Sequence, residues 1–397
     1  MKKNNNNNNS IKIEDYKDII GADMMHALIC IAKRLKGIKV QHINSTKIGG
    51  GVAEILYRMA PLMNGLGINT SWDVINVKDS RFYDVTKKIH NTLQGENLEF
   101  SAEEWDLYFK VQQQNSKVID KTADVVFIHD PQPLGLIKYR RMHQKFIWRC
   151  HIDMSNANYK VWQKLRGMAE KYDAAIFHTQ YFAKELSIPL YILGPSIDPL
   201  SDKNKPLEQQ FVKKVLKDYH INPQKPIILQ VSRFDRFKDP IGVIMAYQMV
   251  KKEIDCQLIL AGGAADDDPE GIEVYNEIIK FAQDDKDIHI LNLPPDSHLI
   301  INALQCAADV ILQKSLKEGF GLTVSEALWK KKPVIAGNVG GIKKQMIDNV
   351  TGFLVNTVEG CAYSIRQLLN SKDISAKMGK LGHEYIKENF ILPVHLR

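Results

Sequence analysis

The sequence has no apolar stretch long enough to cross a membrane, and no apolar segment near its start that could serve as a secretory signal. It opens instead with MKKNNNNNNS, which is two lysines followed by a polar tract. A polar tract of this kind cannot bury enough apolar surface to fold, so residues 1–20 are predicted to form a disordered tail. We expect a soluble, cytoplasmic protein without a membrane partner.

Cysteine and metal-binding motifs are also scarce. The five cysteines are odd in number and widely spaced, which argues against a disulfide framework and indicates reduced core residues: Cys30, Cys150, Cys256, Cys306 and Cys361. No set of metal ligands has suitable spacing, so no metal or cofactor is predicted, and a requirement for Mg²⁺ stays open. The net charge of +7 is scattered rather than gathered into a stripe, which argues against a nucleic-acid partner.

The sequence is rich in alternating short and long apolar patterns. At 397 residues the chain exceeds what one hydrophobic core usually supports, so two domains are expected. Short β-rich runs alternate with longer amphipathic stretches, which is typical of βαβ units and parallel sheets. Strands are predicted near residues 39–43, 70–75, 124–128, 145–149 and 174–178, and then near residues 226–232, 257–262, 288–291, 308–313 and 333–337.

One segment interrupts this alternation. LGPSIDPLSDKNKP, residues 193–206, holds three prolines and several polar residues, as linkers commonly do. We therefore predict an α/β protein with two doubly wound domains, over residues 21–200 and 201–375. Ligands of such sheets bind beyond the carboxyl ends of the strands, so the residues that follow each strand are the candidates for function.

Three consecutive glycines follow the first predicted strand, in STKIGGGVAEIL. Gly49, Gly50 and Gly51 precede a predicted helix, so the backbone could approach a ligand closely and the helix start could offer N–H groups to an oxyanion or a hydroxyl. The stretch is not GxGxxG, so a nicotinamide or flavin fingerprint is absent. A plain strand-to-helix turn is the alternative.

Two further strand ends carry a histidine and an aspartate. HDPQP supplies Asp130, and RCHIDMS supplies His151 and Asp153. Neither segment comes with a third metal ligand or with a nucleophilic Ser or Cys. Hydrogen bonding to a polar ligand fits these residues better, with hydrogen bonds inside a loop as the alternative.

In the second half, VSRFDRFKDP places three cations after a predicted strand. Arg233, Arg236 and Lys238 are what a diphosphate requires, because charge-assisted hydrogen bonds strengthen on burial. A solvated charge run ahead of the helix that starts near Asp239 is the alternative, and it applies most to Arg236.

The stretch EGFGLTVSEA sets two carboxylates eight residues apart. Gly319 and Gly321 prevent one continuous helix, so Glu318 is predicted to lie in a loop. A helix then begins near Leu322 or Thr323 and presents N–H groups to an anion.

Glu326 lies one turn inside this helix. Its carboxylate could accept hydrogen bonds from two vicinal hydroxyls, which is what a ribose presents. The alternative is a capping box in which Glu326 folds back on Thr323. Together with the nearby cations, the arrangement favours a nucleotide-sugar site.

These motifs carry a family resemblance. EGFGLTVSEA resembles the E-x7-E motif of family 4 retaining glycosyltransferases, and VSRFDRFKDP resembles the diphosphate clamp that precedes it. With HINSTKIGGGVAEIL, IHDPQP, WRCHIDMS and GPSIDP, the chain is similar to the trehalose glycosyltransferring synthases, and retaining trehalose phosphorylases are near relatives. The resemblance covers residues 38–390 and implies the GT-B fold, with two Rossmann-like domains that face each other across a cleft.

The resemblance implies a role for each candidate residue. The implied catalytic residues are Arg233, Lys238, Glu318 and His151, and the implied donor-binding residues are Gly50, Gly51, Gly319, Phe320, Gly321, Leu322, Thr323 and Glu326. Arg233 and Lys238 would hold the donor diphosphate and neutralise the leaving group, as a metal does elsewhere. Glu326 would bind the ribose and Glu318 the transferred glucose, with His151 near the reacting carbon.

The implied reaction moves glucose from a nucleoside diphosphate glucose to free glucose and forms α,α-trehalose. Asp130 and Asp153 would hold acceptor hydroxyls. Configuration would be retained by front-face attack, since no carboxylate is nominated as a nucleophile. A trehalose phosphorylase, a transferase with another acceptor, and a non-catalytic nucleotide-sugar sensor stay open as alternatives, as do the base of the donor and homodimer formation.

Similar proteins finish with a helix that returns to the first domain. Residues 376–397 are expected to belong to that helix, and the chain stops at NFILPVHLR, before such a helix would be complete.

Overall fold

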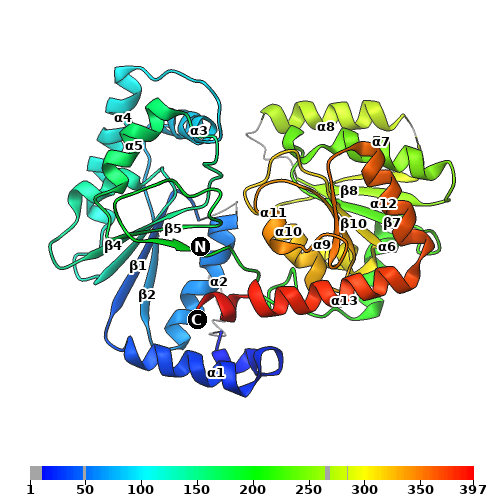
Figure 1. Cartoon of the computed structure of the whole chain (residues 1–397), viewed down its shortest axis with the longest axis horizontal. Helices are drawn as coiled ribbons and strands as arrows, with labels where there is room; N and C mark the ends of the chain where they lie inside the picture. Colours follow the sequence, from blue (N-terminus) through cyan, green and yellow to red (C-terminus); the bar gives the residue numbers. More distant parts are fainter. Residues whose placement is uncertain (1–10, 48–50, 264–268, 284) are drawn as a thin grey trace, which may run out of the picture. The chain divides into compact units, whose positions relative to one another are not determined.

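The computed structural model describes residues 11–47, 51–263, 269–283 and 285–397. Contacts divide the chain into unit 1, which is Met1–Gly194 with His395–Arg397, and unit 2, which is Pro195–Val394. Each unit contains a six-stranded sheet in which all paired strands run parallel (Figure 1). Parallel pairing is what the alternation of strands and helices in the sequence predicted.

Unit 1 has the strand order β2-β1-β3-β4-β5-β6. Its strands are β1 Lys39–Asn44, β2 Asn69–Val74, β3 Val125–His129, β4 Lys145–Cys150, β5 Ala174–Phe177 and β6 Leu190–Ile192. Its helices are α1 Lys17–Arg34, α2 Gly51–Gly65, α3 Arg81–Leu93, α4 Ala102–Gln114 and α5 Tyr159–Ala169, with short 3-10 turns at Ile13–Tyr16, Asn115–Val118 and Leu134–Tyr139. This order is one of the doubly wound arrangements.

Apolar side chains cover both faces of the sheet of unit 1, as burial between two helix layers requires. Val126 of β3 and Phe146 of β4 belong to the large core formed with α3, α4 and α5. Val125 and Phe127 point the other way and pack in a smaller cluster with residues of α1 and α2. In Figure 1, α3, α4 and α5 lie together on one side of the sheet, and α1 and α2 lie on the other.

Unit 2 has the strand order β12-β11-β10-β7-β8-β9. Its strands are β7 Ile227–Val231, β8 Gln257–Gly262, β9 Ile288–Asn292, β10 Val310–Gln313, β11 Val334–Gly337 and β12 Gly352–Val355. Its helices are α6 Gln209–Asp218, α7 Pro240–Lys251, α8 Pro269–Ala282, α9 His298–Ala307, α10 Leu322–Trp329, α11 Ile342–Gln345, α12 Val358–Asn370 and α13 Lys372–Asn389, followed by α14 Leu392–His395, and a 3-10 turn spans Arg236–Lys238. The strand order reverses between β7 and β10, which is where ligands bind in sheets of this kind.

The predicted strands are all present, each within two residues of its predicted bounds. Two further strands, β6 and β12, were not predicted. Both are edge strands of three or four residues; β6 is exposed throughout, whereas β12 is mostly buried. The helix expected from Gly51 is α2, whereas Gly49 and Gly50 lie outside the described residues.

The disordered tail predicted over residues 1–20 is wrong for its later part. Ile13–Tyr16 form a 3-10 turn, and α1 begins at Lys17. Ile13 and Tyr16 are buried, so this segment gains the apolar contacts that the polar tract before it lacks. Residues 1–10 lie outside the described part of the chain.

All five cysteines are free thiols. Cys150, Cys256 and Cys361 are buried in the two main cores, as predicted. Cys30 is exposed on α1, so the prediction of a core position fails for it. Within the described residues, the structure contains no helix with both the length and the apolar character needed to span a membrane.

Candidate functional site

Two loops of unit 2 meet where its strand order reverses. One follows β7 and carries Lys238, and the other follows β10 and carries Glu318; β7 and β10 are paired neighbours. The backbone N–H of Leu316 donates to the carbonyl oxygen of Phe237 at 2.8 Å and joins the loops. Lys238 Nζ lies 2.5 Å from Glu318 Oε2, with the two side chains only 17% and 10% exposed. The structure thus brings together a cation and a carboxylate that the sequence placed in separate motifs.

Glu318 is held by more than this ion pair. Its Oε2 also accepts hydrogen bonds from Gln313 Nε2 at 3.1 Å and from Ser315 Oγ at 3.3 Å. On the other loop, Gln230 Nε2 donates to the carbonyl oxygen of Lys238 at 2.7 Å. Both partners of the ion pair are therefore oriented by further hydrogen bonds within the protein.

Gly340 and Gly341, a glycine pair that follows β11, pack closely against the loop that carries Glu318. At Gly340, whose φ is +48°, an added Cβ would lie 1.7 Å from the carbonyl oxygen of Glu318. At Gly341 it would lie 2.3 Å from the carbonyl oxygen of Gly319. Only glycines let the segment after β11 approach the loop this closely. Phe320, which follows, is buried and accepts a hydrogen bond from Gln345 through its carbonyl oxygen.

Helix α10 begins at Leu322, as predicted, with Gly321 as its N-cap at a φ of +81°. Within the described residues, the N-cap makes no side-chain hydrogen bond to this helix start. Thr323 is engaged elsewhere, because its Oγ1 donates to the carbonyl oxygen of Val231 at 3.3 Å. The backbone N–H of Ser325 donates to Gln345 Oε1 at 3.1 Å, and the dipole of the helix gives its start a positive potential.

Glu326 does not fold back on Thr323, so the capping-box interpretation is wrong. The Glu326 side chain is buried, with Lys203 Nζ 3.6 Å from Oε1 and Gln305 Nε2 3.2 Å from Oε2. Lys330 lies nearby, and burial lowers the pKa of its ammonium group to about 8 although Glu326 opposes this shift. A buried carboxylate held by a lysine and an amide is therefore available at the first turns of α10.

Lys203 and Gln305 were not identified as site residues from the sequence. Lys203 belongs to the segment treated as a linker, and Gln305 lies in the last turn of α9. Neither lies in a motif or at a predicted strand end, so only the tertiary structure could reveal them.

The other two cations of this region differ from Lys238. Arg236 forms ion pairs with Glu277 at 2.8 Å and Glu273 at 3.1 Å on α8, so the surface-charge interpretation holds for it. The Arg233 side chain is 66% exposed and lies 3.4 Å from Asp235. The Arg233 side chain is thus far more exposed than that of Lys238.

In unit 1, a cavity of about 160 Å³ opens at the ends of β1 and β3 and the start of α2. Its lining residues are Asn44, Ser45, Thr46, Gly51, Val52, Ala53, His129 and Asp130. Gly51 and Asp130, which the sequence proposed from different motifs, therefore meet at one cavity. Asp153 is not among its lining residues; Asp153 Oδ1 accepts the backbone N–H of Ser155 at 2.9 Å, as the loop alternative proposed.

Asp130 is buried in an unusual backbone conformation. Its φ is +65°, and its Oδ1 accepts the backbone N–H of His151 at 2.7 Å. Burial raises the pKa of the Asp130 carboxyl to about 7, although the hydrogen bond from His151 and the nearby charge of Arg149 oppose this shift. Asp130 can therefore change its charge near neutral pH at the rim of the cavity.

His151 is surrounded by other histidines. Its Nε2 lies 3.0 Å from His129 Nδ1, and its Nδ1 lies 2.9 Å from His178 Nε2. Burial lowers the pKa of His151 well below the ordinary value, and the neighbouring His178 and Arg149 act in the same direction. Both ring nitrogens are thus occupied by neighbouring rings, a contact that the motif around His151 did not indicate.

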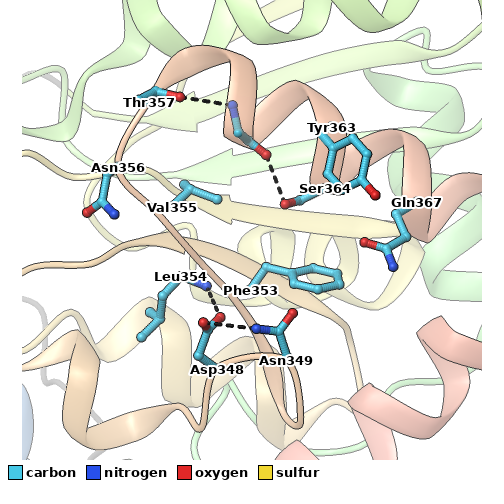
Figure 2. Close-up of a pocket in the computed structure, with 11 residues that line it drawn as sticks. Asp348, Asn349, Phe353, Leu354, Val355, Asn356, Thr357, Tyr363, Ser364 and Gln367 are labelled. Carbon is cyan, nitrogen blue, oxygen red and sulfur yellow. Dashed lines mark hydrogen bonds between the residues drawn. The ribbon is translucent and has the colours of Figure 1, made fainter.

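Unit 2 also has a hollow beside β12 and α12 (Figure 2). Its volume is about 360 Å³, and Asp348, Phe353, Tyr363 and Gln367 are among its lining residues. The carboxylate of Asp348 accepts the backbone N–H of Leu354 at 2.8 Å. No residue that the sequence proposed for the site lines this hollow, so it is separate from the candidate site. Within the described residues, no three His, Cys, Asp or Glu side chains are grouped as a metal ion would need.

Two family models match the chain. The model described as trehalose synthase, N-terminal domain, matches residues 42–184, and the model described as glycosyl transferases group 1 matches residues 212–385. Trehalose synthase from Thermococcus litoralis is 45% identical over 391 residues, covering 97% of this chain and 95% of that protein. Trehalose phosphorylase from Pleurotus pulmonarius is 28% identical, covering 95% of this chain and 58% of that protein.

A solved structure with the same fold is the UDP-forming α,α-trehalose-phosphate synthase from Burkholderia xenovorans. Its TM-score is 0.70 at 14% identity, and the match covers 90% of this chain and 96% of that chain. At this identity the likeness concerns the fold alone, which is the predicted GT-B fold. With both family models matched, and with a relative 45% identical along nearly all of its length, the chain belongs to the trehalose synthase family of glycosyltransferases.

Proposed function

We propose that this protein transfers a glucosyl group from a nucleoside diphosphate glucose to free glucose and forms α,α-trehalose with retained configuration. The observation that carries the proposal is the Lys238–Glu318 ion pair, which lies in the loops beside the start of α10. A fixed cation and a helix start are suited to an anionic leaving group, and a fixed carboxylate is suited to sugar hydroxyls. The membership of the trehalose synthase family supports this choice of substrates.

The donor would be held by unit 2. Arg233, Lys238 and the backbone from Gly319 to Thr323 would bind the diphosphate, so that its developing charge is neutralised as the bond breaks. Glu326 would accept hydrogen bonds from the ribose, and Glu318 would hold hydroxyls of the transferred glucose. The proposal needs neither a metal ion nor an organic cofactor.

The acceptor would be held by residues of unit 1. Asp130 and Asp153 would bind acceptor hydroxyls, and Gly50 and Gly51 would offer backbone close to the sugars. In the transfer, the bond between the anomeric carbon and the diphosphate oxygen breaks, and the acceptor oxygen bonds to the same face of that carbon. The acceptor proton passes to the departing phosphate oxygen, so no enzymic nucleophile is needed.

The test is to incubate the purified protein with glucose and, separately, with ADP-, UDP- and GDP-glucose, and to analyse the products by NMR. We expect α,α-trehalose with at least one donor, which would also identify the base. Absence of trehalose in every tube, with trehalose cleaved when phosphate is supplied, would replace the proposal with a phosphorylase. Donor binding without turnover on any acceptor would indicate a nucleotide-sugar sensor.

A further inference from the structure

Four histidines of unit 1 form one continuous chain of hydrogen bonds. His42 Nδ1 lies 3.0 Å from His129 Nε2, His129 Nδ1 lies 3.0 Å from His151 Nε2, and His151 Nδ1 lies 2.9 Å from His178 Nε2. Every link joins the Nδ1 atom of one ring to the Nε2 atom of the next. The rings of His129 and His151 are also stacked, with centroids 5.3 Å apart.

The sheet explains why these histidines meet. They lie on or directly after β1, β3, β4 and β5, which are consecutive neighbours in the sheet. In the strand register His42 pairs with Phe127, so His129 is two residues further along, and His129 pairs with Arg149, two residues before His151. This diagonal step of two residues keeps successive side chains on the same face, within reach of each other.

Burial favours the neutral form of all four imidazoles. Burial lowers the pKa of His42 and of His178 to about 3, with the charge of Arg149 acting in the same direction. The pKa values of His129 and His151 are lowered well below the ordinary value for the same reasons. Arg149 on β4, Asp130 after β3 and His395 near the chain end are the other titratable groups around the chain of rings.

Neutral rings can be linked in only two ways. A neutral imidazole has one N–H and one acceptor nitrogen, so a ring that accepts at Nε2 must donate from Nδ1. One link therefore determines the next, and either all four rings carry the proton on Nδ1 or all four carry it on Nε2.

The two arrangements differ in which end of the chain of rings carries an N–H group. With protons on Nε2 it is His42 Nε2, and with protons on Nδ1 it is His178 Nδ1; both atoms are buried. In either arrangement the four rings share one tautomer, because each ring determines the tautomer of the next.

We propose that His129 is a positioning residue that, backed by His42, fixes His151 in a single neutral tautomer with both ring nitrogens occupied. This role rests on the proposed function, in which His151 lies near the reacting carbon. Transfer of a glucosyl group passes through an oxocarbenium-like state that carries positive charge. A ring that stays neutral and stationary avoids adding a second positive charge there.

The first test measures the rings directly. In protein labelled with ¹⁵N-histidine, NMR reports the protonation state of each ring nitrogen, and single substitutions assign the four signals. We expect His42, His129, His151 and His178 to share one tautomer and not to titrate between pH 5 and pH 8. Different tautomers among the four rings, or a titration near pH 6.5, would overturn the proposal.

The second test compares two substitutions that branch at the same atom. His129→Asn keeps an amide near the position of Nδ1, which can donate or accept a hydrogen bond, whereas His129→Leu removes it. We expect His129→Leu to lower kcat for trehalose synthesis by about tenfold to hundredfold with little change in KM, and to make activity fall on acidification as His151 becomes able to bind a proton. His129→Asn should keep the flat pH profile and most of kcat.

Equal losses in both variants, with unchanged pH profiles, would show that His129 only fills space and would refute the positioning role. If wild-type protein forms no trehalose, the proposed function fails, while the NMR measurement still decides the tautomers. The NMR measurement on wild-type protein also decides them if the leucine variant does not fold.

Discussion

Lys238 and Glu318 are 80 residues apart in the chain, yet they form a 2.5 Å ion pair at the ends of two paired strands. The two loops that carry them are joined by a backbone hydrogen bond and backed by glycines. The pair therefore joins the two loops at the point where the strand order of unit 2 reverses. Several outcomes follow from this arrangement and can be measured.

Removal of the Lys238 charge should affect turnover strongly. A charge-assisted contact made mainly to the leaving group stabilises the transition state by about 3 kcal/mol, so Lys238→Ala should lower kcat roughly a hundredfold. Arg236→Ala is the matched control, because this cation is two residues away and is paired with α8. Initial rates of trehalose formation measure both, and equal rates for Lys238→Ala and wild type would remove Lys238 from the mechanism.

Substitution of Glu326 should affect the synthesis of trehalose but not its cleavage by phosphate. Glu326→Gln keeps the size of the side chain but leaves Lys203 opposite a neutral amide, so it should raise KM for the nucleotide sugar. A phosphate-dependent cleavage of trehalose has no ribose to bind and should respond little. Steady-state kinetics with both substrate pairs test this, and an unaffected KM would show that Glu326 does not contact the nucleotide.

The glycine pair after β11 should be essential for the site. Gly340→Ala would place a Cβ 1.7 Å from the carbonyl oxygen of Glu318 and force a β-carbon into a φ of +48°, so the loop must move. We expect loss of synthesis and a lower Tm. Gly167→Ala on α5 is the control: nothing lies within 4 Å of its added Cβ, and alanine should stabilise the helix by about 1 kcal/mol. Wild-type activity in Gly340→Ala would contradict this description of the loop.

The histidine chain should make unit 1 labile to acid. The unfolded state binds protons with ordinary histidine pKa values, whereas burial lowers the pKa of His42 to about 3 in the folded state. The contribution of each such histidine to the free energy of unfolding is therefore complete above pH 6.5. It decreases as the pH falls further, by about 1.4 kcal/mol per pH unit.

Urea unfolding followed by tryptophan fluorescence measures this effect, because four of the five tryptophans lie in unit 1: Trp72, Trp105, Trp148 and Trp162. His42→Asn should take up one proton fewer on unfolding, so the slope of the free energy of unfolding against pH should decrease by about 1.4 kcal/mol per pH unit. An identical slope in the variant would mean that His42 is protonated in the folded state.

Asp130 should act in the opposite direction. Burial raises the pKa of its carboxyl from 3.8 to about 7, so the folded state holds a proton that the unfolded state has lost. The contribution of Asp130 is complete below pH 4 and is lost as the pH rises to 7. Asp130→Asn imitates the protonated form and should be more stable than wild type at pH 8 but not at pH 4; a constant difference would refute the raised pKa.

Much of the fold could be predicted from local patterns. The apolar runs located the central strands, and the glycines of EGFG located the start of α10, because both features depend on nearby residues. The short edge strands and the helical segment from Ile13 could not be predicted in this way. Their stability depends on neighbours that are distant in sequence.

The same distinction between local and long-range information applies to the candidate site. The sequence by itself determined the chemistry available, namely Lys238, Glu318 and Glu326 in separate motifs after strands. Only the tertiary structure decided the partners: Lys238 with Glu318, Glu326 with Lys203, and each histidine with the next across the sheet. The physical reason is that parallel pairing carries strand ends from distant parts of the chain to one edge, where burial and hydrogen bonding then set their charges.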